Sequence, residues 1–174
     1  MKIRNGFVSN SSSSSFVVSF PKEPKSAEDV KRMLFDENET HYSGYYSDNL
    51  WTIEQVAQTV WKDICDQIKN DYDLILDELK GVSSYDDPEA PDLDDYWEEK
   101  KWDLHDIACE KYAKKKINEF FNTRKNKLKK LNNEEYIDNA VYVFEYADDS
   151  GSYGSVLEHG DLFKKLKHIK ISKH

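Results

Sequence analysis

The sequence predicts an α+β fold in which a small, mostly antiparallel sheet packs with helices from residues 26–131. Two observations favour this class. Short stretches rich in β-branched and aromatic residues occur near both ends of the chain, and apolar residues in the long middle region recur at helical spacing. This segregation of strands and helices argues against repeated βαβ units. Because 174 residues can bury one core without disulfides or metals, we expect a single domain, residues 1–174.

The first predicted strand covers residues 16–20, FVVSF, and ends before Pro21, which cannot donate a hydrogen bond to a sheet. A short helix is expected to begin after Ser26, the predicted N-cap, because apolar residues follow it at helical spacing. Residues 36–49 are polar and rich in tyrosine around Gly44, which predicts a loop.

The most regular helical pattern follows Thr52. Thr52 and Gln55 have the spacing of a capping box, and apolar residues recur at intervals of three and four through residues 53–68. A second apolar cluster, residues 74–79, extends or follows this helix and is expected to stop at Gly81.

A long helical pattern occupies residues 93–131, which contain neither proline nor glycine. If it were continuous, this helix would be about 58 Å long, whereas a compact chain of this size has a radius of gyration of about 16 Å. We therefore expect either a break near Asn122-Thr123 or a basic end that extends beyond the domain.

The C-terminal region returns to strand character. Residues 140–146 form the first predicted strand of a hairpin, residues 148–152 supply its turn and residues 153–159 return as its second strand. A short helical turn at residues 162–166 precedes a final alternating strand at residues 168–172. The predicted sheet thus consists of the N-terminal strand, the C-terminal hairpin and the last strand.

The net charge of −9 is distributed unevenly. Residues 36–99 carry three basic and 19 acidic side chains, so the rest of the chain is slightly basic. Within this anionic part, residues 82–95 combine two prolines with six acidic residues and predict an exposed acidic loop. Because an acidic surface attracts basic partners and repels phosphate backbones, we expect a protein partner with a basic surface and no nucleic acid.

Other sequence features bear on compartment and chemistry. No apolar run approaches the roughly 20 residues that cross a bilayer, so we expect no membrane partner. Polar residues 9–15 stand where the apolar part of a signal peptide would lie, which favours a cytoplasmic protein. Cys65 and Cys109 lack the spacing of a zinc or redox pair and are expected to be buried free thiols. We expect no metal and no cofactor.

The most unusual motif is GFVSNSSSSSF at residues 6–16. It resembles the N-termini of a set of uncharacterised proteins from bacteriophages and their bacterial hosts. The resemblance is confined to these residues, and it implies a phage-associated origin without any established activity.

Within this motif, Asn10 and Ser11–Ser15 admit three interpretations. They could form a polar loop or edge strand whose hydroxyls bond to the backbone, an anion-binding or modified tract, or the location of a serine nucleophile. The tract lacks the Gly-Lys-Ser/Thr ending of a nucleotide-binding P-loop, and no neighbouring base singles out one serine as a nucleophile.

Two further groups of residues are candidates for function. His159 and Asp161 have a spacing that suits a metal or a general base, although Asp161 is also a natural N-cap for the turn at residues 162–166. Tyrosine beside carboxylate combines rigid contact area with steering of a basic partner. This second group comprises Tyr42, Tyr45, Tyr46, Tyr85, Asp86 and Asp87.

The preferred hypothesis is a non-enzymatic protein that binds another macromolecule, as a phage-encoded modulator or inhibitor of a host protein. Its expected surface combines residues 36–46 with residues 85–95. An alternative is an enzyme or small-anion binder in which Ser11–Ser15 meet His159 and Asp161. A second alternative is an oligomeric structural protein built on the helix at residues 93–131; the sequence leaves the oligomeric state open.

Overall fold

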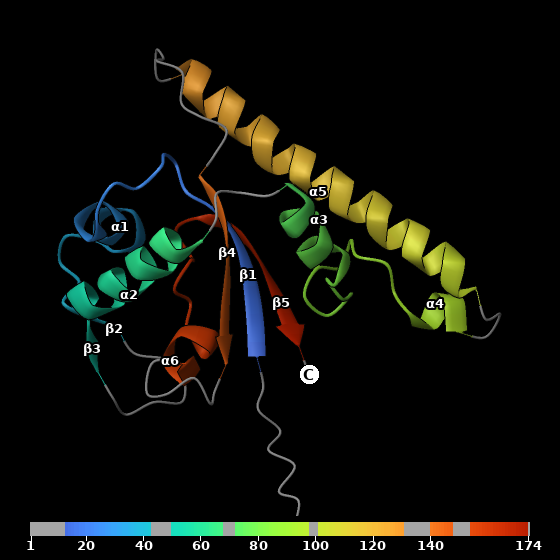
Figure 1. Cartoon of the computed structure of the whole chain (residues 1–174), viewed down its shortest axis with the longest axis horizontal. Coiled ribbons are helices and arrows are strands. Elements are labelled where there is room, and N and C mark those ends of the chain that lie inside the picture. The colour runs from blue at the N-terminus through green and yellow to red at the C-terminus, as the bar shows by residue number, and fades with distance from the viewer. Residues whose placement is uncertain are drawn as a thin grey trace, which may run out of the picture.

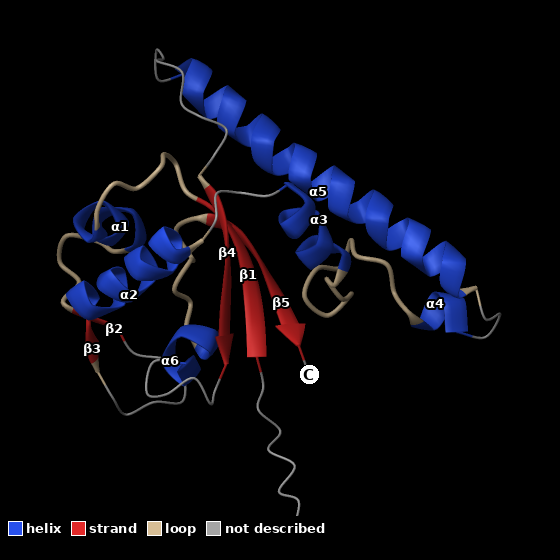
Figure 2. Ribbon diagram, viewed as in Figure 1, coloured by secondary structure: helices blue, strands red, loops and turns tan. Residues whose placement is uncertain are grey.

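The computed structural model describes residues 13–42, 50–67, 72–97, 101–130, 140–147 and 154–173 (Figure 1). Strands and helices occupy most of this part of the chain (Figure 2). In chain order they are β1 (Ser13–Ser19), α1 (Ala27–Leu34), β2 (His41–Tyr42), β3 (Trp51–Thr52), α2 (Ile53–Asp66), α3 (Tyr72–Lys80), α4 (Asp94–Trp97), α5 (Trp102–Lys130), β4 (Val141–Ala147), α6 (Gly154–His159) and β5 (Lys167–Lys173).

The main sheet is antiparallel and has the strand order β4-β1-β5. The N-terminal strand lies in its centre, where Phe16 pairs with Phe144 of β4 and with Lys170 of β5. Long-range pairing therefore places the first strand of the chain between two strands from its C-terminal end. The predicted α+β class and the antiparallel sheet are confirmed.

Helices cover both faces of this sheet and form two apolar cores. Because side chains alternate along a strand, Phe16 and Val18 join one core, whereas Val17 between them joins the other. The first core includes residues of α1 and α2 together with Leu157 of α6. The second core includes residues of α3 and α5, and these helices lie on the opposite side of the sheet (Figure 1).

The predicted helix starts near residues 26 and 52 are confirmed in atomic detail. The Ser26 side chain accepts a hydrogen bond from the backbone nitrogen of Asp29 at 3.2 Å. Thr52 and Gln55 form the reciprocal capping box, with bonds of 3.2 and 3.0 Å between each side chain and the other residue's backbone nitrogen.

The predicted returning strand of the C-terminal hairpin is wrong. Gly154–His159 forms helix α6, and among the described residues β4 pairs with β1 alone. Val156, Leu157 and Glu158 are all buried, although an alternating strand would turn neighbouring side chains to opposite faces. A second small correction concerns the loop predicted at residues 36–49, because His41–Tyr42 pairs with Trp51–Thr52 as a short antiparallel ribbon.

The long helical pattern separates into the short helix α4 and the 29-residue helix α5. The break predicted near Asn122-Thr123 is wrong, since α5 is continuous from Trp102 to Lys130. At 1.5 Å per residue α5 is about 44 Å long, whereas a seven-residue strand spans about 23 Å. The helix therefore extends beyond the sheet that it covers. This agrees with the second alternative predicted from the sequence, a helix end that extends beyond the domain.

Candidate functional site

The end of the serine tract lies inside the fold. Asn10, Ser11 and Ser12 fall outside the described residues, but Ser13–Ser15 belong to the central strand β1. Ser14 and Ser15 are buried, so the interpretations of Ser14 and Ser15 as part of an exposed, modifiable tract or as part of an edge strand are wrong. Their extended backbone pairs with both neighbouring strands, which leaves no anion-binding concavity at these two residues.

Ser14 has a partner that the sequence analysis did not single out. Its hydroxyl donates a hydrogen bond of 3.4 Å to Oε1 of Glu158, a residue of α6 that is only 1 % exposed. Oε2 of Glu158 has no hydrogen-bond partner among the described residues and lies 3.7 Å from Nε2 of His159. Because Ser14 and Glu158 are both shielded from solvent, this pair positions α6 against the sheet and offers no site for a substrate.

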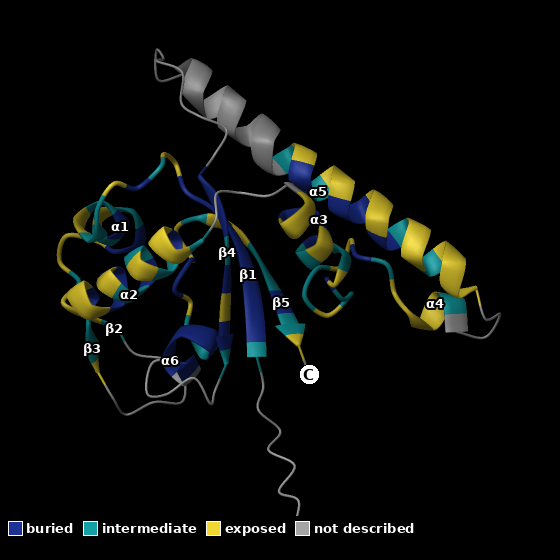
Figure 3. Ribbon diagram, viewed as in Figure 1, coloured by how far each residue is buried: buried dark blue, intermediate teal, exposed yellow. Residues whose placement is uncertain are grey.

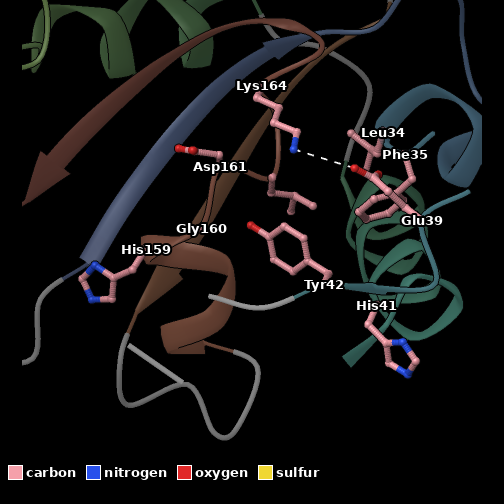
Figure 4. A pocket seen from close by; sticks show the side chains of 10 residues that line it. Leu34, Phe35, Glu39, His41, Tyr42, His159, Gly160, Asp161 and Lys164 are labelled. Atoms are coloured by element: carbon pink, nitrogen blue, oxygen red, sulfur yellow. Dashed lines mark ion pairs between the residues drawn. The ribbon is translucent and has the colours of Figure 1, made fainter. Parts of the chain in front are cut away.

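The structure brings together three candidate residues that the sequence had assigned to two separate hypotheses, Tyr42 to one and His159 with Asp161 to the other. Tyr42, His159 and Asp161 line one cavity of about 430 Å³ between the segment after α1 and the segment after α6 (Figure 4). Tyr45 and Tyr46 lie outside the described residues. We call this cavity the Tyr42 pocket and define it by Phe35, Glu39, Tyr42, His159, Asp161 and Lys164.

The Tyr42 ring lies in the middle of this pocket, with its hydroxyl directed toward Gly160 (Figure 4). A Cβ atom added to Gly160 would lie 1.8 Å from that hydroxyl, so the approach requires glycine. Phe35 packs edge-on against the Tyr42 ring, with 5.9 Å between ring centroids. Burial and the negative charge of Asp161 raise the pKa of Tyr42 well above its ordinary value, which keeps the hydroxyl protonated.

Two ion pairs join the walls of the pocket. Lys164 Nζ lies 3.8 Å from Oε1 of Glu39, and Lys165 Nζ lies 2.6 Å from Oδ1 of Asp36. The turn that carries both lysines is closed by a backbone hydrogen bond of 3.1 Å from Lys164 to the carbonyl of Asp161. The pocket is therefore assembled from segments about 120 positions apart in sequence, which no local pattern could reveal.

The first half of the acidic loop is bound within the fold. Asp86 accepts hydrogen bonds from the backbone nitrogen and hydroxyl of Ser172, at 3.1 and 2.8 Å. Asp87 accepts a bond of 2.8 Å from the Tyr112 hydroxyl and lies 2.7 Å from Lys116 Nζ. Burial raises the pKa of Asp87, but its hydrogen bonds, chiefly that from Lys116, outweigh burial and hold the pKa below its ordinary value.

The second half of the loop and the start of α5 face solvent. Seven large hydrophobic side chains are exposed among the described residues, and five of them lie within residues 85–107 (Figure 3). Tyr85 is 98 % exposed and Ile107 is 62 % exposed. We call this region the acidic-apolar surface and define it by the exposed residues Tyr85, Asp92, Leu93, Asp94, Asp95, Trp102, Asp103, Leu104, Asp106 and Ile107.

A groove of about 430 Å³ runs into this surface between the loop and α5, and Tyr85, Leu93 and Cys109 are among its lining residues. Cys109 Sγ lies 3.6 Å from Nε2 of His105. Burial, with a smaller effect of Asp106, raises the pKa of the Cys109 thiol, which argues against an activated nucleophile. The prediction of a buried thiol is confirmed for Cys109 and is wrong for Cys65, which is exposed.

No family model matches this chain, and no curated protein or solved structure matches it either. The resemblance at residues 6–16 to phage and bacterial proteins therefore stays a prediction. Across the described ranges, no helix is both long and apolar enough to cross a bilayer. The same ranges hold no group of three or more His, Cys, Asp or Glu side chains placed to ligate a metal ion.

Proposed function

We propose that the protein binds a partner protein with a basic surface, and that the acidic-apolar surface makes the contact. The observation that carries the proposal is the gathering of exposed hydrophobic side chains among exposed carboxylates. Tyr85, Leu93 and Ile107 are exposed together with Asp92, Asp94 and Asp95. Large exposed apolar groups gathered in one region are typical of interaction sites, whereas isolated ones are ordinary.

The apolar side chains would provide the affinity of this contact. Aromatic and large aliphatic side chains dominate binding energy when a partner removes them from water. Trp102 and Tyr85 are the two aromatic anchors, and the groove between the loop and α5 is large enough to receive one side chain of the partner. The proposed interface is therefore centred on the loop and the first turns of α5.

The charge of this region defines the class of partner. Residues 85–107 carry ten acidic and two basic side chains. Asp86, Asp87 and Glu89 are engaged by Ser172, Lys116 and other groups of the same chain. The remaining carboxylates include five exposed aspartates, of which Asp92 also accepts hydrogen bonds from the Ser84 hydroxyl and the Asp94 backbone nitrogen. A surface of this sign accelerates the approach of a basic partner and disfavours nucleic acid.

Residues 36–42 are not part of the proposed interface, although the sequence predicted that they would be; residues 43–46 lie outside the described part of the chain. Tyr42 is packed against Phe35 and Gly160, so its ring offers little area to a partner. The proposed surface is thus confined to one end of the molecule, where α4 and the start of α5 lie (Figure 3).

Site-specific photocrosslinking in the source cell tests this proposal. A photoreactive benzoylphenylalanine introduced at Tyr85 or at Ile107 should capture the same partner protein. The matched control carries it at Leu50, which is 67 % exposed but lies outside the surface. Asp92→Asn, Asp94→Asn and Asp95→Asn together should reduce capture at Ile107. Equal capture from Leu50, capture only of a second copy of this chain, or no capture would contradict the proposal.

A further inference from the structure

The Tyr42 pocket belongs to a different part of the molecule from the acidic-apolar surface. Its walls come from the α1 and α6 side of the sheet, whereas α5 covers the opposite face (Figure 1). Its volume of about 430 Å³ is within the usual range for small-molecule sites. The proposed protein interface makes no use of this cavity, so its polar groups require a separate explanation.

One of these groups is the hydroxyl of Tyr42. This oxygen is buried and has no hydrogen-bond partner among the described residues. Buried polar atoms in folded proteins are nearly always satisfied, so an orphaned one at a cavity marks a place where a ligand gains a hydrogen bond. The protonated hydroxyl can donate to a ligand or accept from an N–H group of a ligand.

The charged side chains around the pocket determine whether a positively or a negatively charged ligand is favoured. The pocket has two carboxylates, Glu39 and Asp161, and a single lysine, Lys164, which pairs with Glu39. Among the described residues the exposed carboxylate of Asp161 makes no ion pair. An anion would be repelled here, whereas an ammonium group is attracted.

The apolar part of the pocket lining suits the hydrocarbon part of such a ligand. Phe35 and Tyr42 pack against each other and line the cavity, so they give it an apolar wall that suits methylene groups. Leu162 extends this apolar wall. The cavity thus combines an uncompensated carboxylate, a buried hydroxyl and aromatic rings within one small volume.

We propose that the Tyr42 pocket binds a small organic cation, with its ammonium group held near Asp161 and the Tyr42 hydroxyl and its carbon chain against Phe35. The ligand class is a free short-chain amine. Gly160 is a positioning residue in this site, because any side chain there would displace the Tyr42 hydroxyl.

Calorimetric titration of the full chain with 1,4-diaminobutane tests the proposal, with 1,4-butanediol as a probe of the same length that lacks charge. The diamine should bind at least about tenfold more tightly than the diol, because only the diamine pairs with a carboxylate. Inorganic phosphate should not bind. Absence of diamine binding, equal binding of the diol, or binding of phosphate at this pocket would overturn the proposal. Tighter binding of N-acetyl-lysinamide than of the diamine would overturn the free-amine class.

Matched variants locate the binding. Asp161→Asn should weaken diamine binding about tenfold, and Tyr42→Phe, which removes only the hydroxyl, about threefold. Asp95→Asn and Tyr85→Phe make the same chemical changes at exposed positions outside the pocket and should leave affinity within twofold. Unchanged affinity in Asp161→Asn would overturn the assignment. Photocrosslinking from Ile107 should be the same in Asp161→Asn and the parent chain. The failure of the amine-site proposal can therefore be distinguished from the failure of the protein-interface proposal.

Discussion

The two halves of the acidic loop have similar composition and opposite surroundings. Asp86 and Asp87 bind Ser172, Tyr112 and Lys116 of the same chain. Asp94 and Asp95, a few positions later, are exposed. The comparison shows that a run of like charge can serve two purposes, because the first half joins elements of the fold while the second half remains available to a partner.

The strongest test of this difference removes the carboxylate of Asp87. Asp87→Ala leaves the partly buried Tyr112 hydroxyl without its acceptor and leaves Lys116 paired with Glu89 but not with Asp87. The free energy of unfolding should therefore fall by about 2–3 kcal/mol. Urea denaturation measures the change. Asp95→Ala is the matched control and should change stability by less than about 0.5 kcal/mol. An equal loss of stability in Asp87→Ala and Asp95→Ala would contradict the different structural roles of the two halves of the loop.

A smaller loss is expected at Asp86, which binds the edge strand β5. Asp86→Ala removes the acceptor for two donors of Ser172 and should lower the free energy of unfolding by about 1–2 kcal/mol. Hydrogen exchange at the Ser172 amide should also become faster, since this amide loses the Asp86 carboxylate as an acceptor. Unchanged exchange at Ser172 would argue against a structural role for Asp86.

Low pH should weaken the interactions that join the first half of the acidic loop to the rest of the fold. Hydrogen bonds from Lys116 hold the pKa values of Asp87 and Glu89 below their ordinary range, despite the opposing effect of burial at Asp87. A carboxylate with a lowered pKa in the folded state stabilises the fold above its unfolded pKa of about 4 and loses that contribution as pH falls through the lower folded value. Unfolding measured between pH 5 and pH 3 should therefore show a smaller decline in Asp87→Asn than in the parent chain. An identical decline would exclude this linkage.

The smallest effect on stability is expected in the exposed half. Asp92→Asn, Asp94→Asn and Asp95→Asn together should leave the free energy of unfolding within about 0.5 kcal/mol of the parent. The same variant should reduce crosslinking from Ile107 at low salt more than at high salt, because screening weakens long-range attraction. A large loss of stability in this variant would mean that these carboxylates are structural, as Asp86 and Asp87 are.

Several elements could be predicted because the interactions that form them are local. The capping box of Thr52 and Gln55 spans three positions, and the alternation within residues 16–20 places Phe16 and Val17 on opposite faces. The strands at residues 141–147 and 167–173 could also be predicted. Residues 162–166 form turns and not the predicted helical segment, and the helix at residues 154–159 was not predicted. Residues 156–158 are buried one after another because helix α6 packs against β4, and only the tertiary structure brings these two elements together.

The site residues illustrate the same limit. His159, Asp161 and Tyr42 were recognisable as candidates from residue type alone, yet their common pocket depends on segments far apart in the chain. Glu158 received no role from the sequence, because a glutamate beside apolar residues carries no sign of whether it will be buried. Only the position of α6 against β1 places its carboxylate beside Ser14.

The sequence by itself determined the fold class, the capped helices and the concentration of negative charge in one third of the chain. These properties follow from composition and from interactions between residues a few positions apart. The tertiary structure alone decided which carboxylates are paired, which serines are buried and which tyrosine faces a cavity. The physical reason is that pairing and burial depend on long-range contacts, such as those that place β1 between two C-terminal strands.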